Sequence, residues 1–126
     1  RILHFKKLCL IYRELIKNNN MKIKIIQTTI DSIKIAESIS ELLVNNNASP
    51  CVQIISNVKS VYQWKDKVEH SSEILLLIKT IPENVQKCKN IILKHHNYDT
   101  PEIIVMDGYI LEDDYQAWFI EHCRKI

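Results

Sequence analysis

The residues with the clearest capacity for chemistry lie in one stretch, KHHNYDTPEI, which runs from Lys94 to Ile103. Imidazole is the commonest protein ligand for copper and zinc, and a nearby carboxylate such as Glu102 can complete or orient such a site. Adjacent helical residues point about 100° apart, so His95 and His96 cannot share one ligand position. The stretch therefore offers at most one imidazole to a metal. The alternative is a helix end, where a histidine meets the dipole and the last carbonyls.

Four cysteines are spread along the chain, at Cys9, Cys51, Cys88 and Cys123, and none forms a C-x-x-C pair. This spacing indicates reduced thiols in a cytosolic-type compartment and does not indicate a disulfide framework. Cys51 is the best thiolate candidate, because soft ligands favour Cu(I). Its alternative is a small buried apolar residue at the start of a strand.

Composition excludes several classes of function. The 126 residues fit one domain, and a net charge of +2 gives no reason to expect nucleic acid as a partner. No apolar run reaches the roughly 20 residues that span a bilayer, so no membrane insertion is expected. The single glycine, Gly108, excludes a phosphate loop, a Rossmann fingerprint and a nucleophile elbow. No catalytic residue can be assigned from spacing, and we expect a protein that is not an enzyme.

Hydrophobic periodicity predicts strand, helix, strand, strand, helix, strand and a terminal helix within residues 21–126. The expected strands are Met21–Thr28, Cys51–Ile55 continued by Ser60–Trp64 after a turn at Ser56–Asn57, Ser72–Thr80, and Pro101–Asp107. The first expected helix runs from Ile33 to about Val44 and is capped by Asp31 or Ser32, and the second runs from Pro82 to His96. The terminal helix is expected from a cap at Asp113 to Cys123, with Tyr115, Trp118 and Phe119 on its buried side. Gly108 is expected at a bend or bulge. Residues 1–20 are interpreted as an extension, either disordered, helical, artificial in origin or the remnant of a targeting segment.

This order is typical of the α+β, ferredoxin-like βαββαβ sandwich, here with an extra C-terminal helix. Two helices cover one face of such a sheet, yet the strand SEILLLIKT is apolar on both faces: Ile74, Leu76 and Ile78 alternate with Leu75 and Leu77. The terminal helix can cover part of the second face. The rest would be a large exposed apolar patch, so the pattern predicts a homo-oligomer.

The chain from Met21 to Cys123 resembles the CutA family of divalent-cation tolerance proteins. The family pattern has a strand beginning at Cys51 and Val52, an S-x-Y-x-W hairpin, an E-x-x-L-x-I-K-T strand, an H-P-Y-x-x-P-E-I junction and a short tyrosine-tryptophan helix. The matching residues are Ser60, Tyr62, Trp64, Glu73, Leu76, Ile78, Lys79, Thr80, His96, Tyr98, Pro101, Glu102, Ile103, Tyr115 and Trp118. Asn97 replaces the junction proline, and WKDK replaces the usual W-E-G-K turn.

The resemblance implies a homotrimer with sheet contacts between subunits, and tolerance to divalent cations, copper above all. On that basis the expected metal ligands are His96, Cys51 and Glu102, with no cofactor required. Tyr62, Trp64 and Tyr98 are expected at a subunit interface or in a pocket. The alternative is a PII-like signalling or scaffold trimer that binds a small anionic effector or a partner protein. A cytoplasmic location is expected, or an organelle if residues 1–20 are a targeting remnant.

Overall fold

The computed structural model describes residues 21–124, so the expected extension 1–20 lies outside the described residues. The elements are β1 (Met21–Ile30), α2 (Ile33–Asn45), β2 (Cys51–Trp64), β3 (Lys67–Thr80), a 3-10 turn η1 (Pro82–Asn84), α3 (Val85–His95), β4 (Ile104–Ile110) and α4 (Asp113–Cys123). Their order is the one that hydrophobic periodicity predicts.

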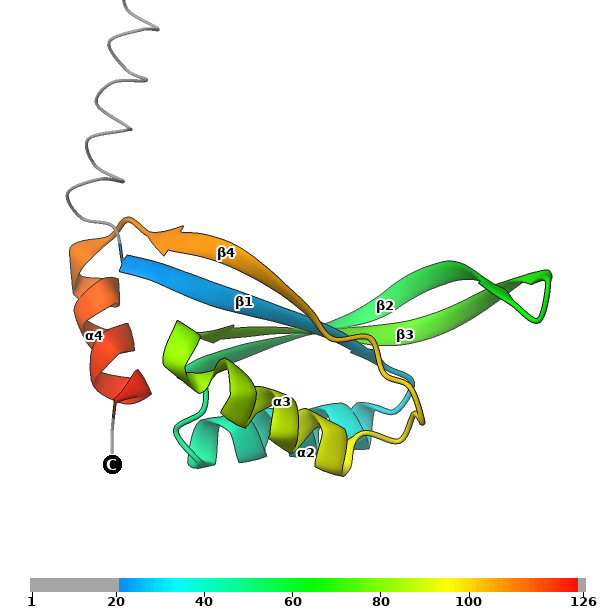
Figure 1. Ribbon diagram of the computed structural model, residues 1–126, viewed down its shortest axis with the longest axis horizontal. Coiled ribbons are helices and arrows are strands. Elements are labelled where there is room, and N and C mark those ends of the chain that lie inside the picture. The colour runs from blue at the N-terminus through cyan, green and yellow to red at the C-terminus, as the bar shows by residue number, and fades with distance from the viewer. Residues whose placement is uncertain (1–20, 125–126) are drawn as a thin grey trace, which may run out of the picture.

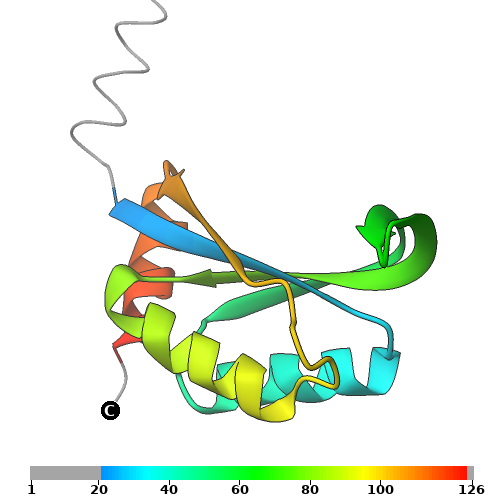
Figure 2. The same ribbon diagram turned by 45° about the vertical axis from the view of Figure 1, so that its right-hand side comes forward.

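The four strands form one antiparallel sheet in the order β2-β3-β1-β4. Helices α2 and α3 lie side by side on one face, and α4 stands at the end of the sheet where β1 begins (Figures 1 and 2). This is the split βαβ arrangement with an added terminal helix, and the predicted ferredoxin-like α+β fold is confirmed.

The main core lies between the sheet and helices α2 and α3. Ile26, Ile30, Leu76 and Ile78 are fully buried there against the apolar sides of both helices. Side chains of a strand alternate between faces, so every second residue of β1 and β3 enters this core. The intervening residues, among them Leu75 and Leu77, point to the second face and are only partly buried.

Helix α4 covers one end of the second face. Its Phe119 is fully buried and packs with Ile23 of β1 and Ile110 of β4. The prediction that this helix covers part of that face is confirmed. The prediction that Trp118 is on the buried side is wrong, since Trp118 is 39% exposed beside the fully buried Phe119.

Helix α2 begins and ends with local signals that the sequence carries. The Ser32 hydroxyl accepts a hydrogen bond from the Ile35 N–H at 3.3 Å, as expected of an N-cap. At the other end Asn47 adopts φ 55°, and Ala48 N–H reaches back to the Leu43 carbonyl at 2.9 Å. This is a Schellman motif in which asparagine takes the position that glycine usually fills.

Strands β2 and β3 form a hairpin that extends well beyond the helices (Figure 1). The expected turn at Ser56–Asn57 is wrong: β2 is continuous, with a register shift between Ile55 and Val58 and Asn57 at φ 63°. A bulge of this kind absorbs an extra residue without ending the strand. The two-residue turn at Lys65 and Asp66 has φ values of 49° and 64°, as hairpin turns of the I′ type require.

The last strand begins later than the sequence pattern predicts. β4 pairs with β1 only from Ile104, which lies opposite Gln27, so Pro101 and Glu102 remain outside the ladder. Gly108 forms no bulge and lies in regular register opposite Ile23. A Cβ there would approach Ile25 Cδ1 to 3.1 Å, which explains the glycine by packing. The cap of α4 is Glu112 and not Asp113: the Glu112 carboxylate accepts from the Tyr115 N–H at 2.6 Å.

Candidate functional site

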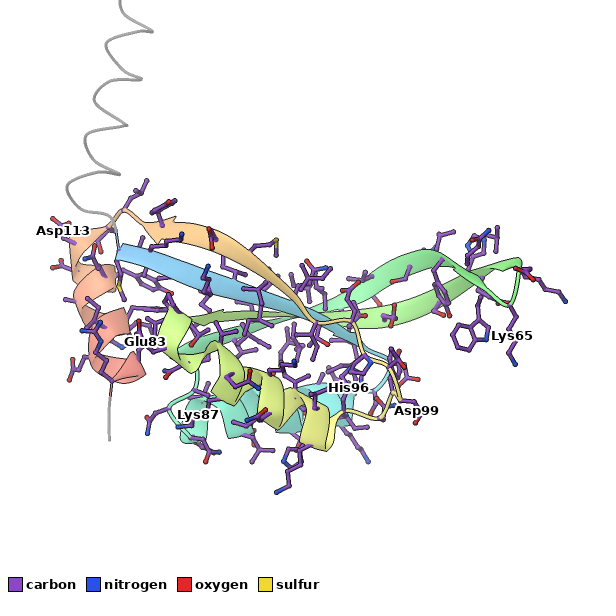
Figure 3. The ribbon with its side chains drawn as sticks, in the orientation of Figure 1. Lys65, Glu83, Lys87, His96, Asp99 and Asp113 are labelled. Atoms are coloured by element: carbon purple, nitrogen blue, oxygen red, sulfur yellow. The ribbon has the colours of Figure 1, made fainter. Side chains whose placement is uncertain are left out.

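His96 lies at the junction between α3 and β4, against the end of β1 (Figure 3). Its Nδ1 accepts a hydrogen bond from the Tyr98 N–H at 3.0 Å, and its Nε2 lies 2.9 Å from the Thr29 carbonyl. Because Nδ1 accepts, Nε2 must carry the proton and donate to Thr29. The ring therefore supplies a hydrogen-bond donor to the Thr29 carbonyl, in the part of the β1 edge that β4 does not pair with. His95 is exposed on the last turn of α3.

Tyr98 connects this junction to the β2–β3 hairpin. Its hydroxyl donates to Glu73 Oε2 at 2.8 Å, and its ring lies 4.7 Å from the His96 ring. Burial, followed by the hydrogen bond to Glu73 and the nearby carboxylates, raises the pKa of Tyr98 well above its usual range. The phenol is therefore neutral at physiological pH and acts as a donor.

Glu102 lies on the same junction, two residues before β4. One of its oxygens, Oε2, accepts a hydrogen bond from Gln27 Nε2 at 3.1 Å. Glu102, Glu73 and Tyr98 line one open cleft with a volume of about 380 Å³. The remaining lining residues are Thr29, Ser60, Val61, Tyr62 and Thr100.

Cys51 lies apart from this cleft. It begins β2 opposite Lys79 of β3 and is half-buried on the second face of the sheet. Glu102 contacts Gln27 of β1, and β3 lies between β1 and the strand β2 that carries Cys51. Two strand spacings separate Cys51 from Glu102 by roughly 10 Å across the sheet. Within residues 21–124 no three histidine, cysteine or carboxylate side chains converge on one point that could hold a metal ion. One subunit therefore brings His96 and Glu102 to one junction and leaves Cys51 elsewhere.

The expected aromatic residues divide between two places. Tyr62 lines the cleft and pairs its hydroxyl with Ser71 Oγ at 2.8 Å, and Tyr98 lies across from it. Trp64 is 60% exposed near the hairpin tip and takes no part in the cleft. Sequence reasoning gave Glu73 no role, although the residue opens the matched E-x-x-L-x-I-K-T segment. Its contact with Tyr98, 25 residues away, depends on the fold.

The buried thiols belong to the core. Cys88 is fully buried, its Sγ donates to the Ala48 carbonyl at 3.3 Å, and burial raises the pKa of this thiol from 9.0 to about 11. The unfolded chain would lose this proton near pH 9, whereas the folded chain keeps it until about pH 11. Stability from Cys88 is therefore complete below pH 9 and is lost as the pH rises to 11.

We expect the free energy of unfolding of the wild type to fall by roughly 2–3 kcal/mol more than that of Cys88→Ala between pH 9 and 11. Urea unfolding at fixed protein concentration and several pH values measures this difference. The other titratable groups are the same in both proteins, and the Cys88 charge also contributes to the raised pKa of Cys123, so the comparison measures Cys88 together with this coupling. If the free energies of unfolding of the two proteins changed equally between pH 9 and 11, the raised pKa of Cys88 would be contradicted.

The fold and the cleft define a class: a ferredoxin-like α+β protein with an extended hairpin and an acidic, tyrosine-lined cleft beside its α3–β4 junction. The chain belongs to the CutA1 divalent ion tolerance protein family, whose model matches residues 24–122.

Relatives from several lineages support this placement. A divalent-cation tolerance protein CutA of Thermus thermophilus is 29% identical over 79% of this chain and 96% of its own length. The chloroplastic CutA of Arabidopsis thaliana is 29% identical over 80% of this chain, but that match spans only 56% of the plant protein. The crystal structure of CutA1 from Ehrlichia chaffeensis, 33% identical, superposes with a TM-score of 0.76 and covers 82% of this chain and 96% of that one. No helix within residues 21–124 has the length and hydropathy needed to cross a bilayer.

Proposed function

We propose that this chain forms a homotrimer that binds divalent cations, copper foremost, in a tolerance or homeostasis role in the cytoplasm. The observation that supports it most directly is the apolar second face of the sheet, which α4 covers only at one end. Exposed apolar side chains continue on this face along both edge strands, at Ile55 of β2 and at Ile104 and Met106 of β4. A second subunit on this face would bury them.

A neighbouring subunit on this face would also provide a way to bring the three expected ligands together. Cys51 and Glu102 lie too far apart in one subunit to hold one ion, so a site that uses both has to draw them from different subunits. His96 has both ring nitrogens engaged, by Tyr98 and Thr29, and a metal has to displace one of these bonds. Such competition favours weak binding of the cation. The proposed role is binding of the cation as cargo, with no catalysis.

The acidic cleft argues against the PII-like alternative. A small anionic effector needs cationic or N–H donors around it, and the described residues that line the cleft include the carboxylates Glu73 and Glu102 and no cationic side chain. Repulsion between an anion and two carboxylates would weaken binding at this place. A cationic ligand fits the described geometry better.

Titration with Cu(II) tests the metal assignment. We expect Cys51→Ser, Glu102→Gln and His96→Ala each to weaken Cu(II) binding at least tenfold, since loss of even a supporting group around a metal typically costs that much. His95→Ala is the matched control, because His95 is the exposed neighbour of His96 on the same helix end. Isothermal titration calorimetry gives the affinities. Equal affinities for all four variants and the wild type would show that these residues do not bind the metal.

A further inference from the structure

The hydrogen bonds of His96 define which of its ring nitrogens carries the proton. The Tyr98 N–H can only donate and the Thr29 carbonyl can only accept, so Nδ1 is unprotonated and Nε2 carries the hydrogen. The backbone of His96 is also held, because its N–H donates to the Ile92 carbonyl at 2.8 Å at the end of α3. The ring therefore has one tautomer and one orientation, and both follow from contacts within a single subunit.

The two ring nitrogens differ in what a metal ion has to displace. A metal ion binds the lone pair of an unprotonated imidazole nitrogen, and in this tautomer that lone pair is on Nδ1. Binding at Nδ1 replaces the Tyr98 N–H and leaves the bond from Nε2 to the Thr29 carbonyl in place. Binding at Nε2 would remove the bond to Thr29 and move the proton to Nδ1, where it would face the Tyr98 N–H. One hydrogen bond is lost in the first case and two are lost in the second.

The Thr29 carbonyl is the kind of partner that supports a histidine ligand. Histidines that bind metals usually donate their other ring N–H to a carbonyl or a carboxylate, which fixes the tautomer and raises the basicity of the ligating nitrogen. This partner lies 2.9 Å from Nε2, on the part of β1 that β4 leaves unpaired. The structure therefore presents His96 as a ligand through Nδ1.

The backbone at Tyr98 is the part of the α3–β4 junction that has to give way to a metal at Nδ1. Two side-chain bonds also hold this segment. Asn97 Nδ2 donates to Asp31 Oδ1 at 2.7 Å, and the Tyr98 hydroxyl donates to Glu73 Oε2 at 2.8 Å. A metal at Nδ1 competes with neither of these two bonds, so the expected change is confined to the peptide between them.

We infer that a divalent cation binds His96 through Nδ1, that the Thr29 carbonyl positions the ring through Nε2, and that binding releases the Tyr98 N–H and shifts the junction backbone. This inference rests on the proposed function, since it takes His96 as a ligand of the cation. It goes further by assigning the ligating atom and by linking occupancy of the site to a local change of conformation. The Tyr98 amide becomes a direct indicator of the bound state.

Nitrogen NMR of the ¹⁵N-labelled full-length chain tests the ligating atom, with Zn(II) as a diamagnetic probe. Without zinc, Nδ1 of His96 should give the resonance of an unprotonated nitrogen and Nε2 that of a protonated one. Saturating Zn(II) should shift the Nδ1 resonance strongly and leave Nε2 protonated. His95→Ala is the matched control, because it removes the exposed neighbouring imidazole and should show the same change at His96.

Amide hydrogen exchange measures the release of the junction. The Tyr98 amide should exchange about tenfold faster at saturating Zn(II), as expected when a single hydrogen bond is lost. The His96 amide is bonded to the Ile92 carbonyl and should not exchange faster, because the end of α3 keeps its conformation.

The outcomes distinguish this inference from the proposed function. If His96→Ala bound Cu(II) as tightly as the wild type in the calorimetric titration, the proposed metal site would lose His96 and this inference would fail with it. With Cu(II) binding that does depend on His96, the inference alone is overturned if zinc binds Nε2 or leaves both ring nitrogens unchanged. It is also overturned if zinc shifts Nδ1 while the Tyr98 amide keeps its exchange rate, or if the change at His96 disappears in His95→Ala.

Discussion

Ile104→Glu should convert the protein from an assembly of about three times 14.8 kDa to a single subunit of 14.8 kDa in dilute solution. Ile104 is 45% exposed on β4, so one subunit can fold with glutamate at this position. It pairs with Gln27 and points to the second face, where we place the neighbouring subunit. Burying a carboxylate in that contact without a partner would cost several kcal/mol per subunit. Light scattering coupled to gel filtration measures the mass.

Ile33→Glu provides the matched control, because Ile33 has the same 45% exposure and begins α2, away from the second face. Glutamate in the first turn of a helix is also favourable toward the dipole. This variant should retain the mass of the wild type. If Ile104→Glu kept the assembly as well, the second face would not be the subunit contact, and a metal site shared between subunits there would lose its basis.

Phe119→Ala should lower the free energy of unfolding by about 3–5 kcal/mol, the usual cost of removing a buried aromatic side chain. Phe119 is fully buried and is the largest residue of the cluster that fastens α4 to Ile23 and Ile110. Its loss leaves a cavity and frees the helix that covers one end of the second face. Urea unfolding followed by tryptophan fluorescence measures the change, with all proteins at one concentration because association adds to stability.

Glu121→Ala serves as the comparison for Phe119→Ala, because Glu121 lies on the same helix and is exposed. Its effect should stay within about 0.5 kcal/mol, as for most surface substitutions. A loss for Phe119→Ala no greater than that of the control would mean that α4 contributes little to the folded subunit. The packing described around Ile110 would then need another explanation.

The order of the elements could be predicted because its signals are local. Alternation in β1 and β3, the Ser32 cap and the proline that opens η1 each act within a few residues of the chain. The start of β4 could not be predicted in this way, since it depends on the pairing of Ile104 with Gln27. The continuity of β2 could not be predicted either. Asn57 has a backbone conformation typical of a turn, but pairing with β3 keeps the strand extended on both sides of it.

The candidate site shows the same limit. The sequence drew attention to His96, Tyr98 and Glu102 by type and spacing, and the structure places all three at one junction. The sequence could not show that both ring nitrogens of His96 form hydrogen bonds, because one partner is the carbonyl of Thr29, 67 residues away. Glu73 was recognised only as part of a motif, and its position beside Tyr98 follows from the hairpin crossing the junction.

The strand order β2-β3-β1-β4 leaves two different strands at the edges of the sheet. A contact that joins the β2 edge of one subunit to the β4 edge of the next is heterologous, so it cannot be completed by a two-fold pair. Every subunit added in this way presents one further open edge, and growth stops only when the last edge meets the first. Closure after three subunits leaves no edge free. The angle between neighbouring sheets, and not only the apolar area that they bury, then decides between a closed ring and an open fibre.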